Sequence, residues 1–228
     1  MDEPTHVDFH FDAMCPYAYR TSVWIRNVRE QNGLDIDWRF FSLEEINRVE
    51  GKKHPWERPW SYGWSLMRIG AYLKRIDPAL LDEWYRISAH ALHVDARKPH
   101  VPEVAKQLLS EMGVDPSVLD EAIADPTTHD DVKADHDRVV DLAGYGVPTL
   151  VFTKDDGTEH ALYGPVIVDP PEGEAALRLW QACLAWLEFP TLFELRKPKQ
   201  RADWLHINDE FTPYLTARDW QTIQNEVA

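Results

Sequence analysis

One cysteine of this chain stands where its sulfur could react. Cys15 follows the alternating stretch VDFHF at 7–11, which has the period of a strand, and precedes Pro16, a residue favoured in the first turn of a helix. The N–H groups at a helix start have no partner and the helix dipole is positive there, so the thiolate is favoured over the thiol. We therefore expect Cys15 to be a nucleophile, with a small buried apolar side chain as the alternative.

A proline before a later strand could lie beside this thiol. Pro148 stands in the sequence GVPT at 146–149, immediately before an apolar run. A cis bond between Val147 and Pro148 would leave neighbouring N–H and C=O groups free to pair with an incoming thiol or peptide. A trans proline that opens a strand is the alternative. We expect Val147, Pro148 and Thr149 to line the site of Cys15.

The elements that carry these residues follow the order strand, helix, strand, helical insert, strand, strand, helix. Alternating residues predict strands over 7–11 and 34–40, and a helix between them implies that the two strands are parallel. Five helical segments follow, at 64–76, 78–97, 102–112, 116–124 and 127–143. Two strands at 148–152 and 159–163, a hairpin turn at 155–157 and a helix over 172–188 complete the order.

This order is that of an α/β, thioredoxin-like fold interrupted by helices. We expect residues 1–43 and 144–197 to form the thioredoxin-like domain and residues 44–143 to form an inserted helical domain. Residues 198–228 are expected to be a C-terminal extension.

Two segments outside this core carry weaker signals. The stretch 46–62 is rich in charge, proline and tryptophan, and we expect a loop with short helical turns, a candidate lid. In the extension, Thr216 followed by Asp219 predicts the opening of a short helix.

Composition excludes several classes of partner. With 24 Lys+Arg against 39 Asp+Glu the net charge is −15, which argues against nucleic acid and anionic membranes as partners. No apolar run approaches the roughly 20 residues of a membrane span and no signal peptide is visible, so we expect a cytoplasmic protein. The second cysteine, Cys183, lies on the apolar face of a predicted helix and is expected to pack there. The sequence leaves the oligomeric state open, with a homodimer as one alternative.

Two motifs resemble the DsbA-like branch of the thioredoxin superfamily, and more closely the actinobacterial mycothiol-dependent nitroreductase group. They are FHFDAMCPYAY at 9–19 and VPT at 147–149, and the stretch that starts YGPV at 163–166 is also similar to that group. The resemblance covers about residues 7–197. It implies a DsbA-type fold with a low-molecular-weight thiol as co-substrate, which is mycothiol in an actinobacterium and glutathione or bacillithiol elsewhere.

The resemblance also implies which side chains surround the thiol. Tyr17 replaces the usual aromatic of the motif and could stack on a ligand, while Asn47 and His93 resemble positions that line the small-thiol pocket. Pro16 completes the motif. His90 and His93 share a helix face, but no Cys, Asp or Glu cluster with ligand spacing accompanies them, so no metal is expected.

The sequence departs from that group at Ala18, where a Cys-X-X-Cys motif would have its second cysteine. Without a resolving thiol, Cys15 is expected to react by a monothiol route, in which a small thiol releases the mixed disulfide. We therefore expect a cytoplasmic thiol oxidoreductase that reduces a disulfide or an electrophile. Two alternatives stay open, a small-thiol-dependent isomerase or transferase, like the hydroxychromene-carboxylate isomerases and kappa-class transferases, and a non-catalytic binding module.

Overall fold

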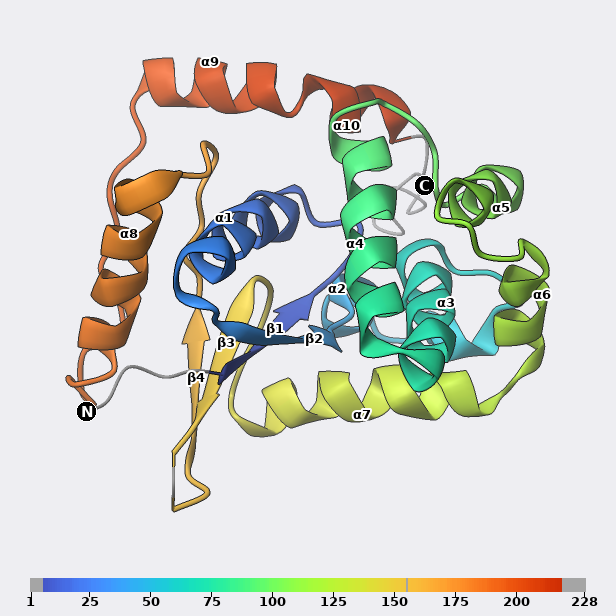
Figure 1. Ribbon diagram of the computed structural model, residues 1–228, viewed down its shortest axis with the longest axis horizontal. Coiled ribbons are helices and arrows are strands. Elements are labelled where there is room, and N and C mark those ends of the chain that lie inside the picture. The colour runs from blue at the N-terminus through green and yellow to red at the C-terminus, as the bar shows by residue number, and fades with distance from the viewer. Residues whose placement is uncertain (1–5, 155, 219–228) are drawn as a thin grey trace.

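The structure, a computed structural model, describes residues 6–154 and 156–218 and has a four-stranded sheet at its centre (Figure 1). The strands are β1 His6–Phe11, β2 Asp35–Phe40, β3 Thr149–Thr153 and β4 Glu159–Tyr163, in the spatial order β2-β1-β3-β4. The β1 and β2 strands are parallel, and β3 is antiparallel to both β1 and β4. The predicted mixed α/β fold with a parallel opening pair is thus confirmed.

Helices lie before, within and after the insertion between β2 and β3. Helix α1 (Pro16–Asn32) links β1 to β2, and α8 (Gly173–Trp186) follows β4. The insertion contains α2 (Leu43–Ile46), a 3-10 turn (Pro55–Glu57), α3 (Tyr62–Ile76), α4 (Pro78–His93), α5 (Pro102–Glu111), α6 (Ser117–Ala124) and α7 (Thr127–Asp141). Two further helices, α9 (Arg201–Glu210) and α10 (Thr212–Ala217), form the described part of the C-terminal extension. None of the described helices is both long enough and apolar enough to span a bilayer.

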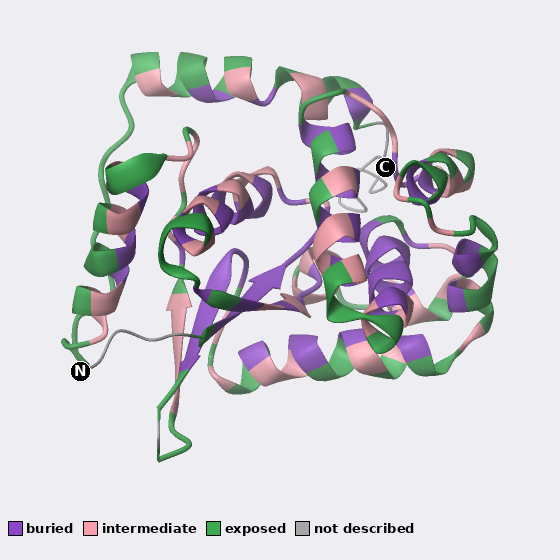
Figure 2. Ribbon diagram, in the orientation of Figure 1, coloured by how far each residue is buried: buried purple, intermediate pink, exposed green. Residues whose placement is uncertain are grey.

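The sheet is covered on both sides, with α1 and α8 packed together above it and α7 running below β2 (Figure 1). All residues of β1 after His6 are buried, which fits a central strand with helices on both faces (Figure 2). Several of the tryptophans serve this core, since Trp24, Trp64 and Trp180 are almost fully buried. Burial of so many large aromatic rings supplies much of the apolar contact of the fold.

The insertion shares the core of the sheet. One cluster of buried apolar side chains contains residues of β1, such as Phe9 and Phe11, together with Tyr85 of α4 and Val132 of α7. Phe11 stacks on Tyr85 with ring centroids 3.7 Å apart. The division at 44–143 stays a prediction, but α4 and α7 within it pack directly on β2.

Two helix predictions need correction. Helix α4 ends at His93 and not near Arg97, because Ala96 adopts a left-handed conformation (φ 54°) and the Arg97 N–H turns back to the Ala91 carbonyl. In the extension, Thr216 lies in the last turn of α10 and does not open a helix; Asp219 lies outside the described residues. The helix starts instead at Thr212, with a proline in its first turn.

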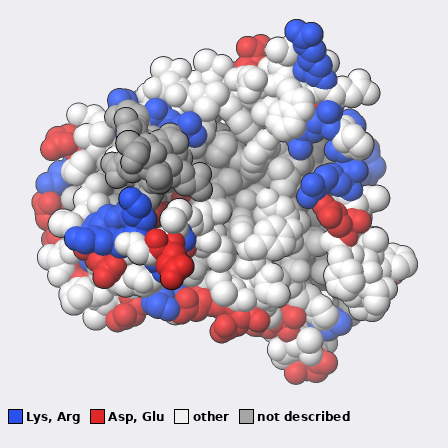
Figure 3. All heavy atoms as spheres, turned by 180° about the vertical axis from the view of Figure 1, so that it is seen from behind, with Lys and Arg blue, Asp and Glu red and all other residues white. Residues whose placement is uncertain are grey.

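Charges on the rear face are mixed. In Figure 3, Lys and Arg side chains occur in small groups beside Asp and Glu, and uncharged atoms fill much of the middle of this view. A continuous basic stripe of the kind that tracks a nucleic-acid backbone is not seen on this face among the described residues.

A buried arginine ties three helices of the insertion together. Arg68 of α3 is 3% exposed, and its guanidinium donates to the Thr128 hydroxyl and to the carbonyls of Ala122, Ile123 and Asp125 at 2.8–3.1 Å. These acceptors belong to α6, the start of α7 and the turn between them. The α6–α7 corner is therefore held on α3 by one side chain.

We expect Arg68→Met to destabilise the protein by about 2–3 kcal/mol, because buried acceptors lose a charged donor. The matched control is Arg86→Met on α4, whose guanidinium is half exposed and pairs with Glu83 in its own helix. That change should cost about 0.5 kcal/mol or less. Urea unfolding of both variants measures the difference, and equal costs would contradict the role given to Arg68.

Candidate thiol site

Cys15 is the N-cap residue of α1, as its sequence context predicts. Its backbone is extended (φ −87°, ψ 115°), and its sulfur accepts the N–H of Ala18 at 3.4 Å. Pro16 lies in the first turn of the helix. A turn in front of the helix, closed by the Cys15 N–H and the Asp12 carbonyl at 3.0 Å, links it to the end of β1.

The loop before β3 lies against this sulfur. Cys15 Sγ is 3.7 Å from the carbonyl oxygen of Val147, to which the thiol donates, and the Val147–Pro148 bond is cis. The Thr149 hydroxyl donates to the Gly146 carbonyl at 2.7 Å, which closes the turn around the proline. Pairing of β1 with β3 explains the meeting of these two segments, because Cys15 follows β1 and Pro148 precedes β3 in an antiparallel pair.

Burial decides the protonation state of the thiol. The Cys15 residue is 6% exposed, and burial raises the pKa of its thiol to about 12, although the Ala18 N–H lowers it and the Asp12 carboxylate raises it further. The helix N-terminus acts in the expected direction, because the N–H groups of Ala18 and Tyr17 lower the pKa, but the loss of water around the sulfur outweighs them.

His93 supports the loop that carries the cysteine. Its Nε2 lies 3.1 Å from the Ala13 carbonyl, and its ring stacks between Tyr19 and Tyr214 with centroid distances of 5.2 Å on both sides. Burial lowers the pKa of His93 to about 3, so the ring is neutral and Nε2 carries the donated hydrogen. Its Nδ1 is buried without a hydrogen-bond partner among the described residues. Contact of His93 with a small thiol stays a prediction.

The other two pocket residues predicted from the resemblance differ in their surroundings. Tyr17 is half-buried and its ring meets Phe211 edge to face, with centroids 5.0 Å apart. Asn47 is exposed, and its side chain donates to the Leu43 carbonyl of its own turn at 2.8 Å. The structure thus brings Tyr17 and His93 close to the thiol loop, and leaves the role of Asn47 in a thiol pocket as a prediction.

A buried carboxyl group, which the sequence reasoning missed, organises the thiol loop. Asp12 accepts the N–H of Met14 at 2.9 Å and that of Leu43 at 2.8 Å, so it ties the end of β1 to α2. Burial raises its pKa to about 6. A methyl group added at Gly63 would come within 2.7 Å of the Asp12 carboxylate, so α3 also begins against this side chain. The position of Asp12, between an apolar strand and the cysteine, is the sequence signal that could have indicated its role.

The extension also contributes residues that were not predicted. Phe211 and Tyr214 contact Tyr17 and His93, as described, and Glu210 pairs with Arg20 of α1 at 3.0 Å. No pattern at 198–228 indicated these contacts, because they join residues more than 100 positions apart in the chain.

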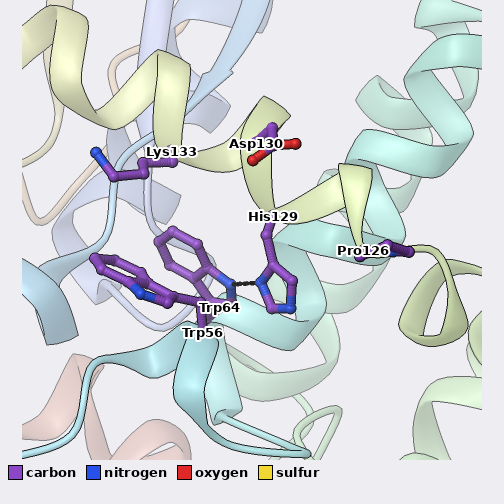
Figure 4. Close-up of a pocket in the computed structure, with 6 residues that line it drawn as sticks. All are labelled: Trp56, Trp64, Pro126, His129, Asp130 and Lys133. Carbon is purple, nitrogen blue, oxygen red and sulfur yellow. Dashed lines mark hydrogen bonds between the residues drawn. The ribbon is translucent and has the colours of Figure 1, made fainter.

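Two hollows of about 350 and 390 Å³ open on the insertion, and Cys15 lines neither of them. The first is lined by Trp56, Trp64, Pro126, His129, Asp130 and Lys133 (Figure 4). The Trp64 indole N–H donates to His129 at 2.8 Å, and Trp56 lies beside it. Of the candidate lid, Trp56 therefore faces α7, whereas the Trp60 indole donates to the His100 carbonyl at 2.9 Å and Tyr62 meets the His100 ring. Trp64 is almost fully buried and packs in the core.

The remaining candidate groups lie away from the thiol. Cys183 is buried in α8 within the apolar core, as expected. One group of described residues, Asp169, His206 and Glu210, brings three potential metal-ligand atoms within 4.8 Å. These groups already pair, His206 with Asp169 and Glu210 with Arg20, and we assign no metal to them.

Comparison with known proteins gives the family. The sequence model described as Rv2466c-like, mycothiol-dependent nitroreductase Rv2466c, matches residues 14–197, which is most of the chain. The chain belongs to the Rv2466c-like family. A relative at 58% identity over 219 residues, covering 96% of this chain and 93% of its own length, is the Mycobacterium tuberculosis protein Rv2286c. Membership in a mycothiol-dependent family supports a low-molecular-weight thiol as co-substrate.

Solved structures show that this Rv2466c-like chain has the DsbA-like thioredoxin fold. It resembles the cytosolic disulfide reductase DsbM from Pseudomonas aeruginosa (TM-score 0.56, 15% identity, 80% of this chain and 97% of that one). It also resembles a 2-hydroxychromene-2-carboxylate isomerase (0.58, 16%, 80% and 95%) and the probable DsbA oxidoreductase SCO1869 from Streptomyces coelicolor (0.52, 19%, 86% and 92%). At these identities the likeness establishes the fold.

Asp12→Asn tests the buried carboxyl group. With a folded pKa of about 6 against 3.8 for the free group, wild-type Asp12 keeps a proton that the unfolded chain loses between about pH 4 and 6. The wild type therefore loses stability as pH rises through this interval, by up to about 3 kcal/mol, and the variant lacks this loss. Urea unfolding should show that the free energy of unfolding of the variant rises relative to that of the wild type between pH 4 and pH 7.

The exposed change Asp209→Asn controls for the removal of one negative charge. A stability difference between Asp12→Asn and wild type that is the same at both pH values would contradict a buried, late-ionising carboxyl group.

Proposed function

We propose that the protein is a cytoplasmic thiol oxidoreductase in which Cys15 is the single nucleophile and a low-molecular-weight thiol is the reductant. The observation that carries the proposal is the position of the Cys15 sulfur. It caps α1, accepts the Ala18 N–H, and lies 3.7 Å from the carbonyl that precedes the cis proline. A disulfide bound along this loop would present a sulfur atom to the end of the helix.

The sulfur chemistry needs no second protein cysteine. The Cys15 thiolate attacks one sulfur of a disulfide RS–SR′, forms Cys15–S–SR, and releases R′S⁻, which takes up the proton that the Cys15 thiol has lost. A small thiolate GS⁻ then attacks the bound sulfur, forms GS–SR, and restores the Cys15 thiolate. A second GS⁻ releases RS⁻ as GS–SG forms, so two small thiols supply the two electrons.

Ala18 makes the external thiol necessary. Its side chain is fully buried where a resolving cysteine would stand, and the other cysteine, Cys183, is buried in α8. We propose mycothiol as the small thiol because of the family, with glutathione or bacillithiol as alternatives to be separated by experiment.

The absence of a resolving cysteine at Ala18 also fits a second candidate function. An isomerase or transferase activates a small thiol without forming a disulfide to the protein, and it needs no resolving cysteine. Cys15 opposes this alternative, because its sulfur would itself form mixed disulfides. A non-catalytic binding module would show neither adduct nor turnover.

Cys15→Ser should abolish thiol-dependent turnover and adduct formation. Reduced wild-type protein incubated with mycothiol disulfide should form a mixed disulfide with one mycothiol and release the other as free thiol, and peptide mass spectrometry should locate the adduct on Cys15. Glutathione and bacillithiol disulfides, tested in the same way, rank the three thiols by rate. Cys183→Ala is the matched control and should react as the wild type does.

The alternatives give different results in this experiment. Turnover retained in Cys15→Ser at saturating thiol would favour the isomerase or transferase, and a Cys15–Cys183 disulfide would overturn the monothiol route.

Ala18→Cys should restore an internal cycle. Residues three apart face the same side of a helix, close enough for a disulfide, and the Ala18 N–H already contacts the Cys15 sulfur. Mild oxidation of this variant should remove two hydrogens from its mass and prevent the addition of mycothiol. Ala18→Ser, similar in size but without a thiol, should still form the one-to-one adduct; an adduct of equal yield on Ala18→Cys would contradict the geometry.

A further inference from the structure

The C-terminal extension reaches residues around the thiol site. In Figure 1, helix α9 runs above α1 toward the end of α4, and α10 then packs against α4. The family match ends at residue 197, so the extension lies outside the matched part of the chain.

Two aromatic side chains of the extension contact the residues around the thiol. Phe211 meets Tyr17, the second residue after Cys15, with ring centroids 5.0 Å apart. Tyr214 lies on His93, whose ring nitrogen contacts the carbonyl of Ala13 in the thiol loop. Burial raises the pKa of the Tyr214 phenol.

The extension is attached by few polar contacts. Arg20 of α1 donates to both the carboxylate and the backbone carbonyl of Glu210 at 3.0 Å. His206 bonds the Asp169 carboxylate at 2.9 Å, and both of these residues are exposed. The exposed His206–Asp169 pair contributes little, and two short helices with few buried side chains are the kind of segment that opens locally.

The two faces of the extension differ accordingly. Ile207, Phe211 and Ala217 are buried against the body of the protein, whereas Trp204 and Leu215 are about half exposed. The buried residues follow one side of α9 and α10, so the segment packs as a cover with a defined inner face.

We infer that α9 and α10 form a lid over Cys15, and that Phe211 and Tyr214 determine by size which molecules reach its sulfur. The inference rests on the proposed function, since it concerns access of the small thiol and the substrate to the same cysteine. A small molecule needs only a local displacement of these two rings, whereas a folded polypeptide needs the whole of α10 to leave. The substrates are then low-molecular-weight disulfides or electrophiles, and not folded proteins.

Two maleimides of equal reactivity and different size test the lid. N-ethylmaleimide and a maleimide attached to a long poly(ethylene glycol) chain are reacted with the full-length protein, and the rate at each cysteine is followed by peptide mass spectrometry. In the wild type we expect the bulky reagent to modify Cys15 at least about tenfold more slowly than the small one. Phe211→Ala and Tyr214→Ala should raise the bulky rate about tenfold, because each removes a buried aromatic contact of the lid.

Control variants separate the lid from general stability. Leu215→Ala changes an exposed residue of the same helix and should leave both rates unchanged. Glu210→Gln removes one charge from the Arg20 contact and should raise the bulky rate about twofold. Cys183 reports on the body of the protein and should stay equally slow in all variants.

Either of two results would overturn the lid. One is a ratio of bulky to small rates that does not change in Phe211→Ala and Tyr214→Ala. The other is an equal acceleration at Cys15 and Cys183, which would mean that the extension stabilises the whole fold. The maleimide rates do not depend on a small thiol. If the rates change as expected but no adduct with mycothiol forms, the lid is supported and the proposed oxidoreductase function is contradicted.

Discussion

The surroundings of one sulfur atom govern the thiol site. Cys15 lies between the N-terminus of α1 and the carbonyl of Val147, where its sulfur accepts the Ala18 N–H and its thiol donates to that carbonyl. Two strands must pair antiparallel for these groups to meet, Asp12 must hold the turn before the helix, and His93 must support the loop at Ala13. The same contacts exclude water, and so the arrangement that positions the sulfur also keeps it protonated.

Local patterns sufficed for much of the fold and for the two halves of the site. The alternation at 7–11 and the proline after Cys15 are short-range signals, and the strand and helix they predict are present. Asp12, Phe211 and Tyr214 could not be found in this way, because their roles depend on contacts with distant segments. The raised pKa of Cys15 could not be predicted for a related reason. The sequence shows the helix terminus, but it does not show how much water the fold removes from the sulfur.

Family membership and the active-site motif point in different directions. The match over residues 14–197 places the chain in a mycothiol-dependent family, whereas Ala18 stands at the position where a dithiol cycle needs a second cysteine. A fully buried alanine there also makes the first turn of α1 a plain packing surface beneath the sulfur. In the proposed function Cys15 keeps the position of the nucleophile, and an external thiol supplies the electrons.

The 6% exposure of Cys15 has a consequence for the lifetime of the protein among oxidants. Peroxide attacks the thiolate form of an accessible cysteine and produces sulfenic acid, which can proceed to irreversible sulfinic and sulfonic acids. A chain without a neighbouring cysteine has no internal disulfide into which a sulfenic acid could condense. A resting sulfur that is covered and protonated is therefore spared this damage, and it is exposed to over-oxidation only during the interval in which it is open for reaction.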